Sequence, residues 1–240
     1  MNETPNPTPI SPLRPAEDTM RTWERIAALV YLAVHLFALP FGVSWLLTQY
    51  PALTEVQANC IYFGIGALFS LAVLGRYLRR SFDALLDRLL LSIASIFGAW
   101  GLQLVLTLLA LAVTSYLLPG MEEGLDTRSF IEISTGAYRK LIYLSILLAP
   151  LVEVPCLCAA LFGGLAKKSR ALAYLVTCLV YALGQTWQYA WAANDPGYLL
   201  YGILMFPACA ALCRCFERSG SVWTPIFYQM LFSATALLAL

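Results

Sequence analysis

The segment APLVEVPCLCAALFGGL, Ala149–Leu165, carries one charged residue, Glu153, in a run that is otherwise apolar. It lies inside a longer stretch, 141–166, that holds no other charged side chain. A helix of about 20 mainly apolar residues is long enough to cross a bilayer. The stretch therefore predicts a membrane-spanning helix with a carboxyl group close to its middle.

The composition of the whole chain supports a membrane protein. Of the 240 residues, 60% are hydrophobic and only 12% are charged, and the mean hydropathy is +0.72. A soluble domain of this length is about half apolar and a quarter charged. We therefore expect an integral membrane protein in contact with membrane lipid. The net charge of +1 gives no indication of nucleic acid binding.

Seven apolar segments are long enough to be spans: 26–47, 60–78, 89–118, 141–166, 171–193, 198–216 and 221–240. They predict an all-α polytopic membrane helix bundle of about seven transmembrane helices, or eight if 89–118 contains two pieces. Residues 1–22 are rich in Pro and Thr and are expected to form a flexible tail, and 23–240 a single transmembrane domain. The seven cysteines lie in or beside apolar runs, which is atypical of a disulfide framework, so we expect them to be reduced.

The distribution of basic residues predicts the orientation. Most Lys and Arg residues lie in the N-terminal tail, in 76–88, in 167–170 and in 214–218. Because positive charge accumulates in cytoplasmic loops, the N-terminus is predicted inside and the C-terminus outside. The polar 119–140 loop is the exception, and we expect it to include a short interfacial helix.

Glu153 is energetically unfavourable at its predicted depth, because inserting an ionised carboxylate at the centre of a spanning helix costs about 2.5–3.5 kcal/mol. Pro155 lacks a backbone N–H and clashes with the preceding turn, so the helix should kink or open there. Pro150 adds a second weak point. Irregular backbone at membrane depth is typical of a helix that lines a cavity. The alternative is a protonated Glu that only hydrogen-bonds a neighbouring helix.

Other polar side chains also fall inside predicted spans. Gln229 and Ser233 are four residues apart and should share a helix face. Glutamines frequently join helices by hydrogen bonds, and the only histidine, His35, is more typical of a packing or hydrogen-bonding residue than of a ligand. A zinc site made by the cysteines is not expected, because it needs four converging thiolates. The remaining residues of this kind are Gln103, Gln185 and Gln188.

The opening segment resembles the first motif, Pro-x-x-Glu-Glu-x-x-x-Arg-Gly, of the CPBP (CAAX protease and bacteriocin-processing) intramembrane proteases. Pro150 and Glu153 match that motif. Val154 stands in place of the second Glu, Cys158 in place of the Arg and Ala159 in place of the Gly.

Two further segments resemble the later motifs of the family, in the same order and spacing. YALGQ corresponds to Phe-x-x-x-His, with Tyr181 in place of the Phe and Gln185 in place of the His. GSVWTPIFYQMLFS keeps the lead into the third motif, His-x-x-x-Asn or Asp. There Gln229 takes the His position and Ser233 the Asn position. The CPBP-like core would thus cover 141–240.

The resemblance implies an intramembrane metalloendopeptidase, in which a Glu pair and two histidines activate water with a zinc-type metal. Of those groups this chain keeps only Glu153. Glutamine cannot take a proton from water, and its amide oxygen is a poor zinc ligand beside imidazole. We therefore predict a pseudoprotease of a bacterial cell membrane that needs no metal or other cofactor. Its former active site would bind a membrane peptide or partner protein through Gln185, Gln188, Gln229 and Ser233.

Two alternatives remain open from the sequence. Glu153 could act as the general base of a surviving endopeptidase. It could instead be the protonatable midplane group of a small transporter, although we see no repeated half of the kind that many transporters show.

Overall fold

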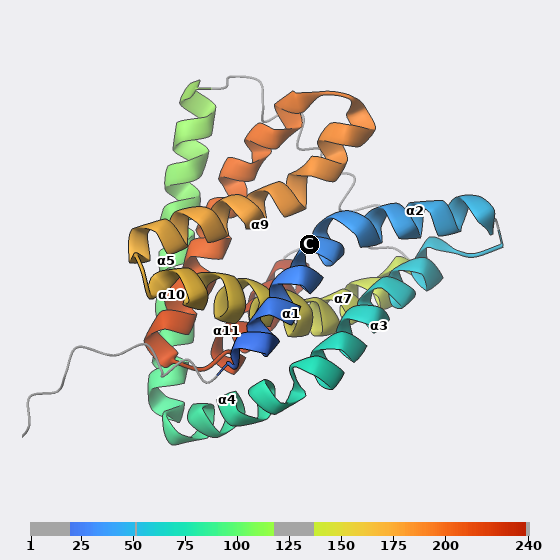
Figure 1. Cartoon of the computed structure of the whole chain (residues 1–240). Coiled ribbons are helices and arrows are strands. Elements are labelled where there is room, and N and C mark those ends of the chain that lie inside the picture. The colour runs from blue at the N-terminus through green and yellow to red at the C-terminus, as the bar shows by residue number, and fades with distance from the viewer. Residues whose placement is uncertain (1–19, 51, 118–136, 239–240) are drawn as a thin grey trace, which may run out of the picture.

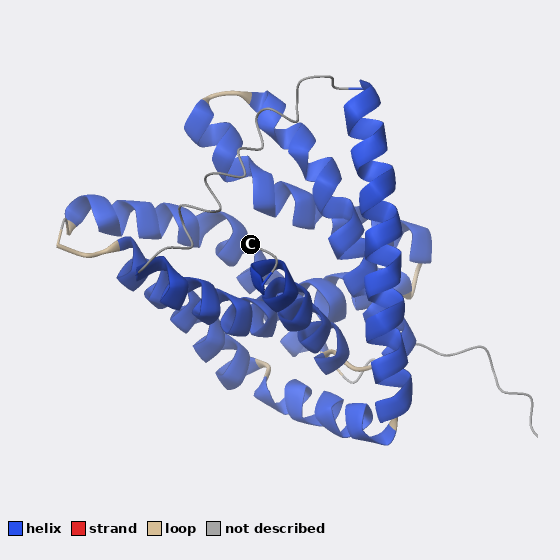
Figure 2. Ribbon diagram, turned by 180° about the vertical axis from the view of Figure 1, so that it is seen from behind, coloured by secondary structure: helices blue, strands red, loops and turns tan. Residues whose placement is uncertain are grey.

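The computed structural model describes residues 20–50, 52–117 and 137–238, and within these ranges every regular element is a helix (Figures 1 and 2). The elements are α1 Thr22–Ala33, η1 Val34–Ala38, α2 Leu39–Gln49, α3 Glu55–Val73, α4 Gly75–Asp87, α5 Leu89–Leu117, α7 Ala137–Val154, η3 Pro155–Phe162, α8 Gly163–Ala166, α9 Arg170–Ala193, η4 Pro196–Met205, α10 Phe206–Ser219 and α11 Trp223–Leu238. The elements η1 and η3 are π-helical and η4 is a 3₁₀-helix. The tail 1–19 and most of the 119–140 loop lie outside the described residues.

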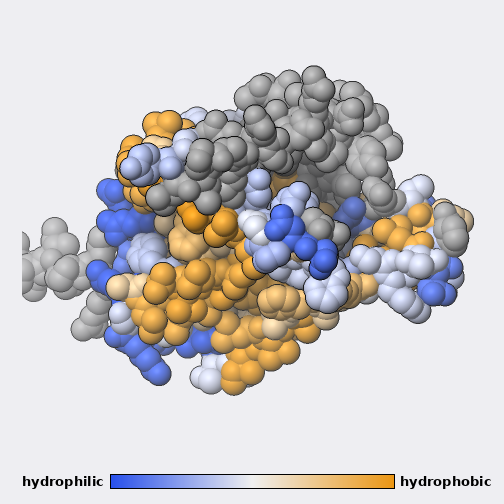
Figure 3. Space-filling model, turned by 90° about the horizontal axis from the view of Figure 1, so that it is seen from above, coloured by the Kyte–Doolittle hydropathy of each residue, from blue (hydrophilic) through white to orange (hydrophobic). Residues whose placement is uncertain are grey.

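All seven predicted spans fall on helices, which confirms the class of all-α membrane bundle. Among the described residues, four helical segments are long and apolar enough to cross a membrane: Thr22–Gln49, Leu89–Tyr116, Ile146–Ala166 and Pro196–Ser219. A fifth is added if the bent pair α3 and α4 counts as one span. The number of seven and the inside–outside orientation stay predictions. Many large apolar side chains are exposed, as a lipid-facing surface requires (Figure 3).

Two of the predicted spans differ in detail from the helices. The segment 60–78 is not straight, because α3 ends at Val73 and the chain bends by 77° into α4. Helix α4 is strongly amphipathic: it buries Tyr77, Leu78, Ser81 and Leu85 and exposes arginines on its other face, so it follows an edge of the bundle rather than its interior (Figure 1). The segment 89–118, in contrast, is the single helix α5.

The chain segment that contains Glu153 is the central one. Of the span Ile146–Ala166, 56% is buried inside the bundle, whereas only 11% of Leu89–Tyr116 is buried. Helix α7 packs between α3 and α11, and η3 packs against α1, α9 and α10. The midspan carboxyl group is therefore surrounded by protein on several sides, while α5 forms an outer wall (Figure 1).

Two glycines allow the helices around this centre to approach closely. A Cβ atom on Gly66 of α3 would lie 2.8 Å from Val152 Cγ2 on α7. A Cβ atom on Gly184 of α9 would lie 2.6 Å from Leu36 Cδ2 in η1. Small residues at helix crossings are typical of membrane bundles, where packing provides much of the association energy. All seven cysteines are free, and six of them are buried.

Candidate functional site

The helix that carries Glu153 changes its geometry directly after that residue. Pro155 has no N–H to donate to the preceding turn, and the chain continues as the π-helix η3. At the end of η3 the N–H of Gly163 points to the carbonyl of Cys158, five residues earlier. A π-helical turn widens the helix and frequently marks a functional site. The opening predicted from Pro155 is thus present as a π-helical stretch.

Glu153 and Gln229 come together in the structure. The carboxamide Nε2 of Gln229 on α11 donates to Glu153 Oε2 over 3.4 Å, with both residues partly buried. The other amide atom, Gln229 Oε1, is buried and has no hydrogen-bond partner among the described residues. The first and third motif segments, 76 residues apart in sequence, therefore meet at one point between α7 and α11.

The position of α11 is fixed by a serine and tryptophan cluster at its start. Ser221 Oγ donates to the carbonyl of Ser81 over 2.7 Å, and the N–H of Val222 donates to Ser81 Oγ over 2.8 Å. The indole N–H of Trp223 donates to the carbonyl of Leu78 over 2.8 Å. Gly220 supplies the left-handed backbone that ends α10, with φ of 74°. The cluster ties α11 to α4, and this sets the rotation and depth at which Gln229 reaches Glu153.

A second polar group, on η1 and α3, was not predicted from the motifs. His35 is 1% exposed, and its Nε2 lies 3.0 Å from the hydroxyl of Tyr62. The same hydroxyl donates to the main-chain carbonyl of His35 over 3.2 Å. The N–H groups four and five residues after His35 do not serve that carbonyl, because the N–H of Leu39 bonds Val34 and residue 40 is proline. Tyr62 therefore satisfies an acceptor that the π-helix and Pro40 leave unpaired.

Tyr31 extends this group toward α7. A Cβ atom on Gly66 of α3 would lie 3.2 Å from the Tyr31 hydroxyl and 2.8 Å from Val152 Cγ2 on α7. Tyr31 stacks on Phe69 with ring centroids 3.9 Å apart, and it lies one turn before His35 on the same helix face. The Tyr31 hydroxyl is buried and unpaired among the described residues. Tyr31, Phe69, His35 and Tyr62 thus form one aromatic group between α1 with η1 and α3.

The other predicted site residues in the motif segments, Gln185 and Ser233, lie on α9 and α11. Tyr181 and Gln185 lie one turn apart on α9, and both are half-buried. Ser233 follows Gln229 by one turn on α11 and is also half-buried. Hydrogen bonds from Gln185 or Ser233 side chains to the carboxyl group are not present among the described residues, so their roles stay predictions.

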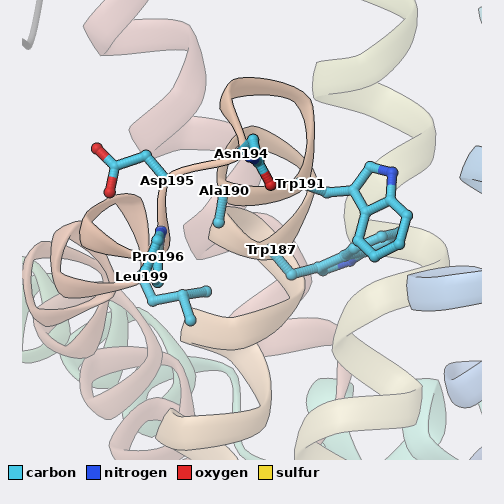
Figure 4. Close-up of a pocket in the computed structure, with 7 residues that line it drawn as sticks. All are labelled: Trp187, Ala190, Trp191, Asn194, Asp195, Pro196 and Leu199. Atoms are coloured by element: carbon cyan, nitrogen blue, oxygen red, sulfur yellow. The ribbon is translucent and has the colours of Figure 1, made fainter.

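Gln188 lies on an exposed part of α9. It lines a surface hollow with Pro40 and Phe41 of α2 and the indole rings of Trp187 and Trp191. A neighbouring hollow, where α9 turns into η4, is lined by the same two tryptophans together with Asn194 and Asp195 (Figure 4). Exposed tryptophans are typical of the membrane–water interface. A binding role for Gln188 stays a prediction.

The side chains around Glu153 are not a suitable set of ligands for the zinc-type metal that the resemblance to the proteases implies. A catalytic zinc site uses three protein ligands such as His and Glu. Here the Glu153 carboxyl group is paired with the carboxamide of Gln229, and a carboxamide is a poor zinc ligand. Among the described residues, groups of three or more His, Cys, Asp or Glu that could hold a metal ion were not found. We therefore derive no chemical step through a metal.

With this geometry in place, the comparisons with known proteins define the class. Residues 136–235 match the family model described as "Type II CAAX prenyl endopeptidase Rce1-like". The matched range covers α7 to α11 almost entirely and coincides with the three motif segments, in agreement with the CPBP resemblance. The search of curated proteins and the search of solved structures gave no match. The chain is accordingly a helical membrane protein whose residues 136–235 are similar to this family.

Proposed function

We propose that this protein is a non-hydrolysing member of the CAAX protease class, which uses the former active site to bind a membrane peptide or a partner protein. The observation that carries the proposal is the pairing of Glu153 with the amide of Gln229, at the position where the resemblance implies a metal-ligating histidine. A carboxamide neither ligates zinc well nor takes a proton from water.

The retained scaffold supports a binding role. The π-helical opening after Glu153 and the serine cluster that holds α11 keep the two motif segments together. Gln229 Oε1 is left without a partner, and a peptide N–H is a suitable donor for it. Buried amide groups that lack a partner are costly, so an occupant that supplies the missing hydrogen bond is favoured.

The experiment combines metal content, cleavage and binding in membranes. Protein purified without chelators is measured for zinc, and a library of membrane and prenylated peptides is tested for cleavage. A photo-crosslinking residue at Ser233 then reports on molecules bound one turn away from Gln229. We expect substoichiometric zinc, no cleavage, and crosslinked adducts that decrease in Glu153→Gln and persist in the control Ser44→Ala on exposed α2. Cleavage that Glu153→Gln abolishes would show a surviving endopeptidase and overturn the proposal.

A further inference from the structure

The turn between α9 and η4 borders a hollow of about 370 Å³ on the surface of the bundle (Figure 4). Its lining combines the indole rings of Trp187 and Trp191 with the carboxamide of Asn194, the carboxylate of Asp195 and apolar side chains that include Leu199. The indole rings lie on one side of the hollow, and the carboxyl group lies on the other (Figure 4). These residues fall outside the three motif segments, so the hollow is a second site beside the one described above.

The hollow lies at the end of two apolar helical segments. Asp195 is the only charged residue between Arg170 and Arg214, and it stands at the turn where α9 ends and η4 begins. A carboxylate is costly in the hydrocarbon region, and exposed tryptophans are typical of the membrane–water interface. Trp191 is 73% exposed. We therefore expect the hollow to lie at the depth of the lipid headgroups.

The indole wall of the hollow is held in place by α2 and η1. The indole N–H of Trp187 donates to the carbonyl of Leu36 over 2.9 Å, and the rings of Phe37 and Phe41 pack on Trp187 with centroids 5.6 and 5.2 Å away. Trp191, one turn later on α9, meets the edge of Phe41 at 6.2 Å. The wall is thus preformed, and its exposed part is an apolar surface available to a guest.

The carboxyl group on the other side is also fixed, but its charge is not compensated. Asp195 Oδ1 accepts from the N–H of Gly197 over 2.8 Å and caps η4. Asn194, with a left-handed φ of 51°, ends α9 and places Asp195 at the rim. Within the part of the chain that the structure describes, Asp195 forms no ion pair with a Lys or Arg residue. A cation that donates hydrogen bonds would be its complement.

The two sides of the hollow together indicate the chemistry of an occupant. Ligand sites are typically apolar, with a few polar groups that fix the orientation of the ligand. Here the polar groups are a carboxylate and a carboxamide oxygen, which accept hydrogen bonds from an ammonium group. The indole rings and Leu199 form an apolar surface for hydrocarbon. A phospholipid with an amine headgroup has both parts and lies at this depth of the membrane.

We propose that this hollow binds a phospholipid with a primary-amine headgroup. The ammonium group donates to Asp195 and Asn194, and the hydrocarbon part lies against Trp187, Trp191 and Leu199. A primary amine fits better than a quaternary one, because only the primary amine has N–H donors for the two side-chain oxygens. The site goes beyond the proposed function, since it concerns the lipid around the bundle and not the occupant at Glu153.

The test compares two lipids that differ only at the nitrogen. Phosphatidylethanolamine carries the ammonium group, and the same lipid with its amine acetylated keeps the phosphate and the acyl chains. Binding to the full chain in detergent micelles is titrated by native mass spectrometry. We expect the first phosphatidylethanolamine molecule to bind in a saturable way and about fivefold more tightly than the acetylated lipid. Fivefold corresponds to about 1 kcal/mol, which is the size of one ion pair at an exposed site.

Three variants locate the site. Asp195→Asn keeps a capping oxygen and removes the charge, so the preference for phosphatidylethanolamine should disappear. Trp191→Ala should weaken the binding of both lipids. Trp45→Ala is its control, because Trp45 is 61% exposed on α2 and lines neither tryptophan hollow, and it should bind as the parent does.

Three outcomes would overturn the amine site: equal binding of the two lipids by the parent, an unchanged preference in Asp195→Asn, or equal losses in Trp191→Ala and Trp45→Ala. Thermal unfolding of each variant shows that a loss of binding is not a loss of fold. Proteolytic activity or stoichiometric zinc, in contrast, would overturn only the non-hydrolysing function.

Discussion

Gln229 on α11 donates its amide hydrogen to Glu153 on α7 over 3.4 Å, which joins two segments 76 residues apart in the chain. Glu153→Gln keeps the shape of the side chain and an acceptor oxygen, so the hydrogen bond can re-form. We expect the stability in nanodiscs to change by less than about 1 kcal/mol, while crosslinking of bound molecules from Ser233 decreases. Thermal unfolding and crosslinking measured on the same preparations check this. A large loss of stability would mean that the carboxyl group is mainly structural.

The second prediction concerns the two glutamines at the histidine positions. If Gln185 and Gln229 both point toward Glu153, the double variant Gln185→His and Gln229→His should gain about one zinc ion per chain, because two imidazoles and a carboxylate form a three-ligand site. Metal content after dialysis is the measurement. The pair Gln188→His and Gln229→His is the control, since Gln188 is exposed beside Trp187 and should not complete a site. Equal zinc uptake by both pairs would contradict the placement of Gln185.

A third prediction tests the close contact between α3 and α7. Gly66→Ala would place a Cβ atom 2.8 Å from Val152 Cγ2 and 3.2 Å from the Tyr31 hydroxyl. Overpacking of this kind typically costs about 1–3 kcal/mol, because the neighbours must move. Gly64→Ala is the matched control, two residues away on the same helix, with no atom within 4 Å of the new Cβ. Unfolding curves of the two variants should differ clearly, and coinciding curves would refute the packing.

A fourth prediction uses the carbonyl of His35, to which the Tyr62 hydroxyl donates. Tyr62→Phe removes this donor, and an unsatisfied buried carbonyl costs about 1–3 kcal/mol. Pro40→Ala restores an N–H that can bond the His35 carbonyl. Tyr62→Phe should therefore be less destabilising in the Pro40→Ala background, with a coupling energy of about 1 kcal/mol in a double-mutant cycle. Strict additivity of the two changes would show that Pro40 has no part in leaving the carbonyl free.

The fifth prediction concerns the serine cluster that holds α11. Ser221 is fully buried, and its hydroxyl donates to Ser81 and accepts from the N–H of Trp223. Ser221→Ala leaves these groups unpaired and should cost about 1–3 kcal/mol. It should also loosen the contact of Gln229 with Glu153, so crosslinking from Ser233 should become less specific. Ser44→Ala on exposed α2 is the control and should behave as the parent does in both measurements.

Some features of the structure could be predicted from particular residues of the sequence, and others could not. The class of helical membrane protein followed from the apolar runs, and the break after Glu153 followed from Pro155, because proline cannot complete an α-helical turn. The bend between Val73 and Gly75 was missed, although the amphipathic spacing of Tyr77, Leu78 and Ser81 indicated it. Tyr62 and Tyr31 carried no motif signal, and only the four-residue spacing of Tyr31 and His35 pointed to a shared face.

The sequence by itself determined that this chain is a bundle of apolar helices, that a carboxyl group lies at the middle of one of them, and that glutamines replace the histidines of the resembling motifs. These properties depend on local chemistry and spacing along one chain segment. Only the tertiary structure brought Gln229 to Glu153 and His35 to Tyr62. Those contacts join residues from different helices, and they are fixed by the rotation and depth at which each helix packs, which the glycine contacts and the serine cluster set.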